Sequence, residues 1–424
     1  MSWALLFVLA ILTLSMIVYG LAERGRFLQY PFLAAIIFLT FVLPQVPGLA
    51  NSRFVPQDAL AKTLFFSILC LGMCAVGWRV GTRWRGPQNI YFSEVRLLQV
   101  ATALSVFGAW FFYKFGQLPD EERLRGMLTG TAVMYLFFAK LLTYGMAIAL
   151  LCCALRPSKW AFGIILFDLA FYLERAVIAG RRSDLAQLFL MVAMACWFQR
   201  RWSMPRPVVI AGVMLGFVAL LTADEYRHST YLQENPDWSA VLDIDVAAKW
   251  EGLLRNGGQE MRNATHAIAR AEEIQSFNYG LSHWNWTVFT YVPAQLIGHD
   301  FKYSLMVDLP DTFDRGYDWH TGTTYTGMAD AFSSFWYFGA VKFFLIAAFM
   351  GLFYSSAMRG HTLMQLAYML STIPSMQAIT HFTNEMVNAW IHIAAFLGPA
   401  LYYASLPRQE VLALTPALDW QRQS

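Results

Sequence analysis

The sequence predicts an all-α polytopic membrane protein, and three observations favour this fold class. Of the 424 residues, 57% are hydrophobic and only 14% are charged, and the mean hydropathy is +0.42. The apolar residues form runs of about 18 to 25, the helix length that crosses roughly 30 Å of hydrocarbon. Short charged clusters separate the runs. This composition excludes soluble enzymes, transcription factors and secreted domains, and a net charge of +3 is too small to indicate nucleic-acid binding.

The apolar runs predict about eleven transmembrane helices, at residues 2–22, 27–45, 60–78, 97–115, 127–155, 160–179, 184–199, 208–222, 331–354, 362–380 and 386–405. Basic residues are concentrated in alternate short connections: Arg24 and Arg26; Arg79, Arg83, Arg85 and Arg96; Arg156 and Lys159; Arg200, Arg201 and Arg206; Arg359; and Arg408. These connections are expected to face the cytoplasm. The amino terminus is then outside, and the first run is expected to be a retained span, because no basic residue precedes it and no small-residue cleavage site follows.

One long connection separates two membrane domains. The predicted organisation is a membrane domain at residues 1–222, an extracytoplasmic loop domain at 223–330, a second membrane domain at 331–405 and a cytoplasmic tail at 406–424. The loop contains 7 of the 31 basic and 16 of the 28 acidic residues, a net charge of −9. A connection of this length is usually functional. We expect helices near 239–256 and 259–276 and irregular backbone after Asp308.

Cationic side chains converge at the outer end of the predicted span at residues 160–179. Arg175 and Arg182 are seven residues apart, which places them on one helix face, and Arg181 is adjacent. Guanidinium groups bind phosphates through paired donors, so we predict an anionic ligand here; snorkelling to lipid headgroups is the alternative. Deeper in the membrane, Lys140 and Asp168 are expected to form a structural ion pair, with a proton path as the alternative.

The outer loop contains two groups of candidate binding residues. Arg262, His266 and Arg270 are spaced four residues apart and share a helix face. This stripe is either a solvated helix face or a docking strip for phosphates. Because the rest of the loop is acidic, such a strip would be the selective place for a phosphate to bind. Trp284 and Trp286 supply flat rings that either stack on sugars or belong to an interfacial aromatic belt.

Acidic, basic and aromatic residues lie together just before the ninth predicted span. Arg315, Asp318 and His320 fall within six residues of each other. A carboxylate or imidazole here could take a proton from a sugar hydroxyl. No HExxH motif and no EF-hand spacing is present in the sequence, so we predict neither a metal nor any other cofactor.

Two short motifs resemble the oligosaccharide repeat unit polymerases, the Wzy-type O-antigen polymerase family. The segment Ala-Gly-Arg-Arg-Ser-Asp at residues 179–184 resembles the family's Gly-Ser-Arg-Gly-like turn, with Arg182 in the arginine position. Residues 321–332, followed by Trp-Tyr-Phe-Gly at 336–339 and by Gly351, resemble the stretch where the family's long loop re-enters the membrane. The chain departs from the pattern at Arg181 and Asp184, where small residues are more usual. The likeness covers about half of the chain.

The resemblance implies a GT-C-like, metal-independent membrane glycosyltransferase at the outer face of the bacterial cytoplasmic (inner) membrane. Such an enzyme joins oligosaccharide repeat units linked to polyprenyl (undecaprenyl) diphosphate by en bloc transfer, for lipopolysaccharide or exopolysaccharide biosynthesis. Arg181 and Arg182, with Arg175 behind them, would bind the donor diphosphate. Arg315 or the stripe from Arg262 to Arg270 would hold the acceptor.

For the proton transfer, the resemblance together with the residue types suggests His320 or Asp318 as the base. The implied partners are the lipid-linked oligosaccharide, membrane lipids, a chain-length regulator and a flippase. A glycan ligase with the same donor would use similar arginines and differ only in its acceptor. A flippase or transporter for lipid-linked sugars predicts charges along a central path and related halves, neither of which is visible in the sequence.

Overall fold

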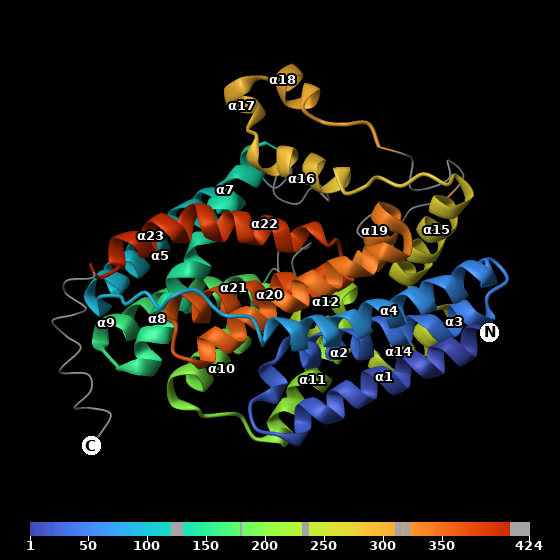
Figure 1. The fold of residues 1–424 in the computed structure, drawn as a ribbon, viewed down its shortest axis with the longest axis horizontal. Helices are drawn as coiled ribbons and strands as arrows, with labels where there is room; N and C mark the ends of the chain where they lie inside the picture. The colour runs from blue at the N-terminus through green and yellow to red at the C-terminus, as the bar shows by residue number, and fades with distance from the viewer. Residues whose placement is uncertain (120–129, 179, 231–236, 310–316, 318–322, 408–424) are drawn as a thin grey trace. The chain divides into compact units, whose positions relative to one another are not determined.

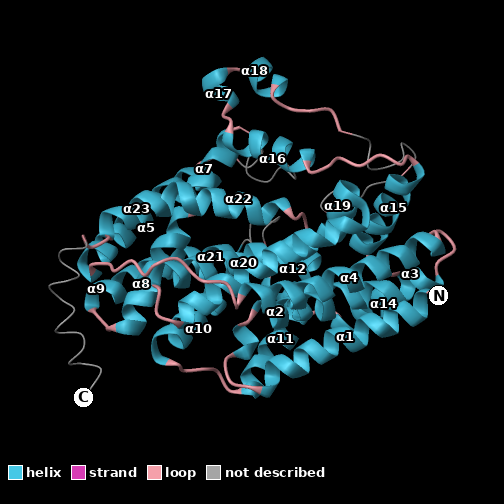
Figure 2. Cartoon of the chain, viewed as in Figure 1, coloured by secondary structure: helices cyan, strands magenta, loops and turns pink. Residues whose placement is uncertain are grey.

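A computed structural model describes residues 1–119, 130–178, 180–230, 237–309, 317 and 323–407. Within these ranges the secondary structure is helical, without a β-strand, as Figure 2 shows. One isolated antiparallel bridge joins Phe92 to Ser405. The all-α prediction is therefore confirmed for the described chain.

The chain forms two compact units, each assembled from separate stretches of sequence. Unit 1 comprises Met1–Trp84, Met204–Leu352 and Ser371–Trp390. Unit 2 comprises Arg85–Ser203, Phe353–Leu370 and the chain from Ile391 onward. Three helices run from one unit into the other: α20 (Ala340–Met358), α21 (Thr362–Thr380) and α22 (Asn384–His392).

Unit 1 contains the amino-terminal helices and those of the long connection (Figure 1). Its first helices are α1 (Ser2–Ala22), η1 (Arg26–Leu28), α2 (Tyr30–Ile37), η2 (Phe38–Val42), η3 (Leu43–Gln45), α3 (Val46–Asn51) and α4 (Gln57–Gly81). Its later helices are α11 (Arg206–Leu221), α12 (Ala223–Ser229), α13 (Trp238–Leu242), α14 (Val246–Asn256), α15 (Gln259–Glu273), α16 (Leu281–Tyr291), α17 (Ala294–Ile297), α18 (His299–Ser304), α19 (Thr326–Phe335) and η5 (Trp336–Gly339).

Unit 2 contains helices from the middle of the chain and from its carboxyl-terminal part. They are α5 (Glu94–Gly116), α7 (Thr131–Ala139), α8 (Leu141–Leu155), α9 (Lys159–Leu173), η4 (Glu174–Ile178), α10 (Arg182–Arg200), η6 (Ile393–Leu397) and α23 (Gly398–Ala404). Helix α8 packs against α5, α9 and α10.

Six helical segments of the described chain are long and apolar enough to cross a membrane: Ser2–Ala22, Tyr30–Asn51, Gln57–Gly81, Glu94–Gly116, Thr131–Leu155 and Thr326–Met358. A seventh is counted if α11 and α12, which meet at a bend of 66°, form one span. The other predicted spans are helical but shorter, broken or more polar. For example, α9 ends at Leu173 and continues into a π-helical turn that contains Glu174 and Arg175. The total of eleven transmembrane helices therefore stays a prediction.

The surface of α1 indicates the environment of these helices. Large apolar side chains are exposed on it, among them Trp3, Phe7, Ile11 and Val18, while Leu9 on another face is buried. Such a contiguous apolar surface is unfavourable in water and matches the hydrocarbon of a lipid bilayer. The apolar helices thus indicate a membrane-embedded protein.

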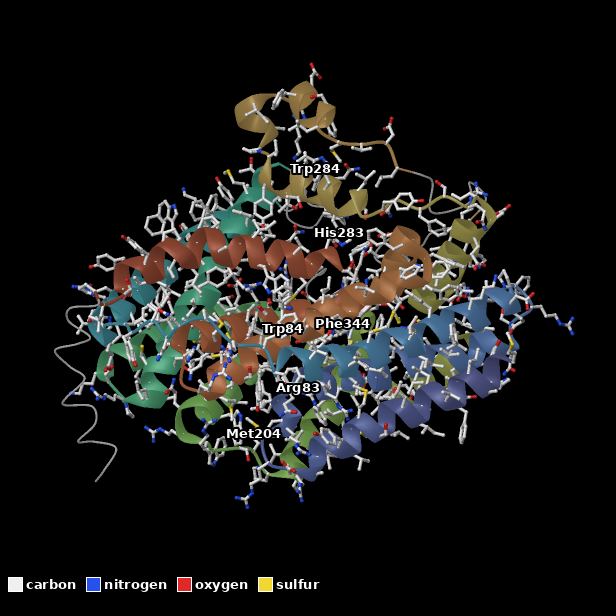
Figure 3. All side chains as sticks on the ribbon, viewed as in Figure 1. Arg83, Trp84, Met204, His283, Trp284 and Phe344 are labelled. Atoms are coloured by element: carbon white, nitrogen blue, oxygen red, sulfur yellow. The ribbon has the colours of Figure 1, made fainter. Side chains whose placement is uncertain are left out.

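Glycines allow two long helices of unit 1 to cross at close range. A Cβ atom on Gly77 of α4 would lie 2.2 Å from the carbonyl oxygen of Phe344 on α20, and one on Gly81 would lie 1.9 Å from that of Ala348. Figure 3 labels Phe344. The Gly-x-x-x-Gly spacing removes side chains from one strip of α4, so the two backbones approach each other directly.

The long connection packs against the amino-terminal helices of unit 1. Helix α14 contacts α3, and α15 lies against α4 and α19 (Figure 1). The packed face of α15 buries small and apolar side chains, including Met261, Ala264 and Ile268. At the turn between α14 and α15, the backbone N–H of Gly258 donates to the carbonyl oxygen of Gln45 (3.1 Å). The helix predicted near 259–276 is confirmed as α15, whereas the single helix predicted near 239–256 is divided into α13 and α14 by a break at residues 243–245. Helix α15 packs against α4, a candidate membrane span.

Candidate functional site

Helix α15 presents the predicted basic stripe on the side opposite its packed face. Arg262, His266 and Arg270 are each partly exposed, because their spacing of four residues keeps them on one face. Arg262 donates through Nη2 to the carbonyl oxygen of Asn256 (3.1 Å), and Arg270 pairs with Glu273 (3.0 Å). The Nε atoms of both arginines have no hydrogen-bond partner among the described residues. Both Nε atoms are buried, so an anionic ligand could reach only the exposed parts of these two guanidinium groups.

The stripe is held in place by a buried hydrogen-bond network. Asn263 is 1% exposed, and its amide donates to Thr323 Oγ1 and to the carbonyl oxygen of Thr324, both at 3.0 Å. The hydroxyl of Tyr317 donates to Asn263 Oδ1 (2.6 Å), and its ring lies 4.4 Å from that of His266. Burial, and then the charge of Arg262, lowers the pKa of His266. The imidazole is therefore neutral at neutral pH and lies between two permanent cations.

The other predicted arginines lie in unit 2, around the start of α10. The guanidinium of Arg175 forms an ion pair with Asp184 (Nε to Oδ2 2.8 Å) and lies over the ring of Phe112. The backbone N–H of Arg181 donates to the carbonyl oxygen of Arg175 (3.1 Å), and α10 begins at Arg182. Asp184, which departs from the family pattern, thus holds Arg175 in place.

The predicted ion pair between Lys140 and Asp168 does not form. Asp168 is fully buried, and its Oδ2 accepts a hydrogen bond from Ser105 (2.8 Å). Its Oδ1 has no hydrogen-bond partner in the described chain. Lys140 is exposed, because α7 ends at Ala139 and the break before α8 turns its side chain outward. The partner of Asp168 is therefore the hydroxyl of Ser105 and not the ammonium group of Lys140.

The predicted catalytic residues Arg315, Asp318 and His320 lie outside the described residues. The two predicted tryptophans are both on α16. Trp284 donates through Nε1 to the carbonyl oxygen of Leu305 (2.8 Å), and the ring of Trp286 lies 6.0 Å from that of Phe382.

A buried polar cluster in unit 1 was not predicted. Asp330 on α19 lies 3.7 Å from Lys342 on α20, with side chains 4% and 15% exposed. Thr383, between α21 and α22, donates to Asp330 Oδ2 through its backbone N–H (3.0 Å) and through its hydroxyl. Lys342 Nζ donates to Ser334 Oγ (2.7 Å) and to Thr383 Oγ1 (3.3 Å). The charges of the pair are thus compensated by hydrogen bonds.

This cluster extends to the loop through His283. His283 Nε2 lies 3.0 Å from Thr383 Oγ1. Figure 3 labels both His283 and the neighbouring Trp284 at α16, with Trp284 nearer to α18. Burial, and then the charge of Lys342, lowers the pKa of His283, while Asp330 acts in the opposite direction.

One signal in the sequence could have revealed the cluster. Lys342 interrupts an apolar run, and a lysine inside a span requires a partner. Its partner Asp330 lies at the border of that run, twelve positions earlier. The break at Trp336, where φ is +52°, brings the two together, and helical periodicity does not predict such a break.

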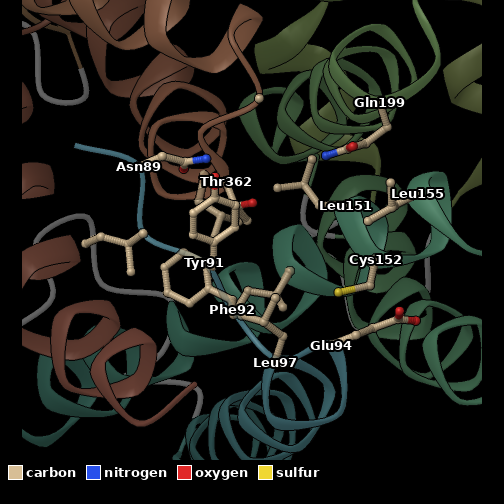
Figure 4. Close-up of a pocket in the computed structure, with 14 residues that line it drawn as sticks. Asn89, Tyr91, Phe92, Glu94, Leu97, Leu151, Cys152, Leu155, Gln199 and Thr362 are labelled. Carbon is tan, nitrogen blue, oxygen red and sulfur yellow. The ribbon is translucent and has the colours of Figure 1, made fainter. Parts of the chain in front are cut away.

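Unit 2 contains a separate cavity of about 180 Å³ (Figure 4). Apolar side chains such as Phe92, Leu97 and Leu151 line it, together with Glu94 and Gln199. None of the predicted site residues lines this cavity.

Neither a search for metal-binding groups nor comparison with known proteins assigns a function to further residues. No group of three or more His, Cys, Asp or Glu side chains in the described chain is arranged to hold a metal ion. Comparison of the chain with protein-family models, curated proteins and solved structures finds no match. The resemblance to the polymerase family stays a prediction that depends on the residues quoted for it.

Proposed function

We propose that this protein is a membrane glycosyltransferase that polymerises oligosaccharide repeat units linked to polyprenyl diphosphate. It would act at the outer face of the bacterial cytoplasmic membrane and supply a surface polysaccharide or exopolysaccharide. The observation that carries the proposal is the stripe on α15, where the partly exposed donors of Arg262 and Arg270 lie on one helix face with His266, whose pKa is lowered. A membrane-anchored helix with such donors suits a lipid-linked diphosphate.

The chemistry of the proposed reaction explains why arginines are needed. The donor glycan leaves its lipid carrier as the bond between its anomeric carbon and the diphosphate oxygen breaks, so negative charge grows on the diphosphate. Guanidinium groups in a site of low dielectric stabilise that charge more strongly than water does. We assign one diphosphate to Arg181 and Arg182, which lie in the sequence between Arg175 and its partner Asp184. The stripe from Arg262 to Arg270 takes the diphosphate of the second lipid.

Replacing Arg182 or Arg270 by alanine tests this proposal in cells that make the polysaccharide. A hydrogen bond to a charged group is worth about 1.5–3 kcal/mol, which corresponds to roughly 10- to 150-fold weaker binding. We expect single lipid-linked repeat units to accumulate and long glycan chains to disappear, while immunoblots show the protein still in the membrane. Gel analysis of glycan chain length provides the readout.

Arg255→Ala is the matched control. Arg255 lies on α14, is exposed and pairs with Glu251 four residues earlier. This substitution should leave chain lengths normal. Normal chain lengths in the Arg182→Ala and Arg270→Ala variants as well would contradict the proposed function.

A further inference from the structure

Helix α16 is fixed at one end to α19 and at the other to α22. Before its first residue, the backbone N–H groups of Asn278 and Tyr279 donate to the carbonyl oxygens of Ser333 and Ser334 at the end of α19 (both 3.0 Å). At its other end, the Tyr291 hydroxyl donates to the carbonyl oxygen of Asn388 on α22 (2.6 Å). His283, one turn into α16, is therefore held in a defined position over the buried cluster.

Hydrogen bonding around Thr383 determines which nitrogen of His283 carries the proton. The carboxylate of Asp330, paired with Lys342, can only accept, so the single hydroxyl proton of Thr383 points to Asp330. Thr383 Oγ1 must then accept from His283 Nε2, which lies 3.0 Å away. In a neutral imidazole the other nitrogen, Nδ1, is left with a free lone pair.

The surroundings of Nδ1 suit a sugar hydroxyl. The hydroxyl of Ser282 lies 3.3 Å from Nδ1, which is a weak contact. Aromatic rings lie on the same side of unit 1: Phe382 is adjacent to Thr383, and its ring is 6.0 Å from Trp286 and 5.1 Å from Tyr325. Apolar ring faces beside hydrogen-bonding groups match the mixed surface of a sugar.

We propose that His283 is the general base of the reaction, with Nδ1 taking the proton of the acceptor hydroxyl; this assignment rests on the proposed glycosyl transfer. The acceptor oxygen forms a bond to the anomeric carbon of the donor glycan. The bond from that carbon to the diphosphate oxygen breaks, and the diphosphate leaves with the electron pair. The hydroxyl proton goes to His283 Nδ1 and then to water. Thr383 and Asp330 are positioning residues, because they fix the tautomer of His283 without touching substrate.

The first test is turnover by the purified full-length protein in lipid nanodiscs with a synthetic polyprenyl-diphosphate-linked repeat unit. General-base catalysis contributes about 10²–10⁴-fold. We expect His283→Gln to lower the rate of glycan transfer by that factor while the Kd for the lipid-linked donor changes little. His299→Gln, a substitution on the exposed helix α18, is the matched control and should transfer at the wild-type rate.

The second test addresses the tautomer in the wild-type protein, independently of turnover. Spectra of ¹⁵N-labelled histidine should show His283 protonated on Nε2 and bare on Nδ1, the signal being assigned by its change in the Thr383→Val variant. Thr383→Val should also lower the transfer rate at least tenfold, and Thr383→Ser should restore it, because serine supplies the same hydroxyl.

The outcomes separate this assignment from the proposed function. Wild-type protein that transfers no glycan overturns the proposed function and the base assignment together. If the wild type is active and the His283→Gln variant is equally active, the base assignment alone is overturned. A nuclear magnetic resonance signal that places the proton of His283 on Nδ1 has the same consequence. A loss of rate together with loss of donor affinity, without the predicted tautomer, assigns His283 a structural role and overturns the base assignment as well.

Discussion

Asp330 and Lys342 depend on each other, since both side chains are largely buried. We expect Asp330→Asn to lower the free energy of unfolding by about 3–5 kcal/mol, because it leaves the buried ammonium of Lys342 without its counter-ion. The double variant Asp330→Asn/Lys342→Met should recover most of this loss, since both charges are removed. Thermal unfolding in nanodiscs measures the effect.

An exposed ion pair of the same unit provides the control for this prediction. Lys249 and Glu225 are 44% and 41% exposed, so water already solvates both charges. Lys249→Met should cost no more than about 1 kcal/mol. Equal losses of stability from Lys249→Met and Asp330→Asn would contradict the prediction that the buried charge of Lys342 needs Asp330 as its counter-ion.

At the level of single residues, the basic stripe could be predicted, whereas the contact of His283 with the buried cluster could not. Arg262, His266 and Arg270 recur at helical spacing within one element, so periodicity alone places them on one face. The contact between His283 and Thr383 joins residues a hundred positions apart. Only the packing of α16 against the junction of α21 and α22 brings these two side chains together, and no local pattern encodes that packing.

Among the elements, the crossing of α4 with α20 depends on glycine. Gly77→Ala should lower the free energy of unfolding by about 1–3 kcal/mol, because the added methyl group would lie 2.2 Å from a backbone oxygen, which cannot move aside without shifting the helix. Gly72→Ala on the same helix is the control. A Cβ there meets no atom within 4 Å, so the higher helix propensity of alanine should leave stability unchanged or raise it by up to about 1 kcal/mol.

Thermal unfolding of the two variants side by side tests the crossing. An equal effect of both substitutions would mean that helix propensity, not backbone contact, determines the response. A stabilised Gly77→Ala variant would contradict the close approach of α4 and α20 itself.

The accuracy of the predicted helix boundaries depends on how uniform each apolar run is. The run at residues 2–22 has no interruption, and α1 has these bounds. The run predicted at 27–45 is instead divided among several short helices between Tyr30 and Asn51. Pro44 and Pro47 lie at the starts of η3 and α3, where a missing N–H is tolerated. Hydropathy predicts an apolar run but not the local breaks that prolines introduce.

For the molecule as a whole, stability should fall in mildly acidic solution. The pKa values of His283 and His266 are lowered in the folded protein from an ordinary value of 6.5. Below pH 6.5 the unfolded chain therefore binds protons that the folded protein does not, so the free energy of unfolding decreases as the pH falls toward the folded pKa values. Above pH 6.5 these two histidines contribute no pH dependence.

Thermal unfolding between about pH 7.5 and pH 5.5 measures this effect. The variant His266→Gln/His283→Gln should lose less stability than the wild type over this interval, because glutamine does not titrate. The same slope in both proteins would mean that other groups determine the acid sensitivity.

The turn between α14 and α15 has a practical consequence for mapping which side of the membrane the loop occupies. A Cβ on Gly48 would lie 2.0 Å from the backbone nitrogen of Gly257, so no room remains between this turn and α3. An epitope tag or reporter inserted into the turn would separate it from α3. The measured location of the label would then not report the location of the loop in the native protein. Gly298, with open space around it, is the better insertion point for such a label.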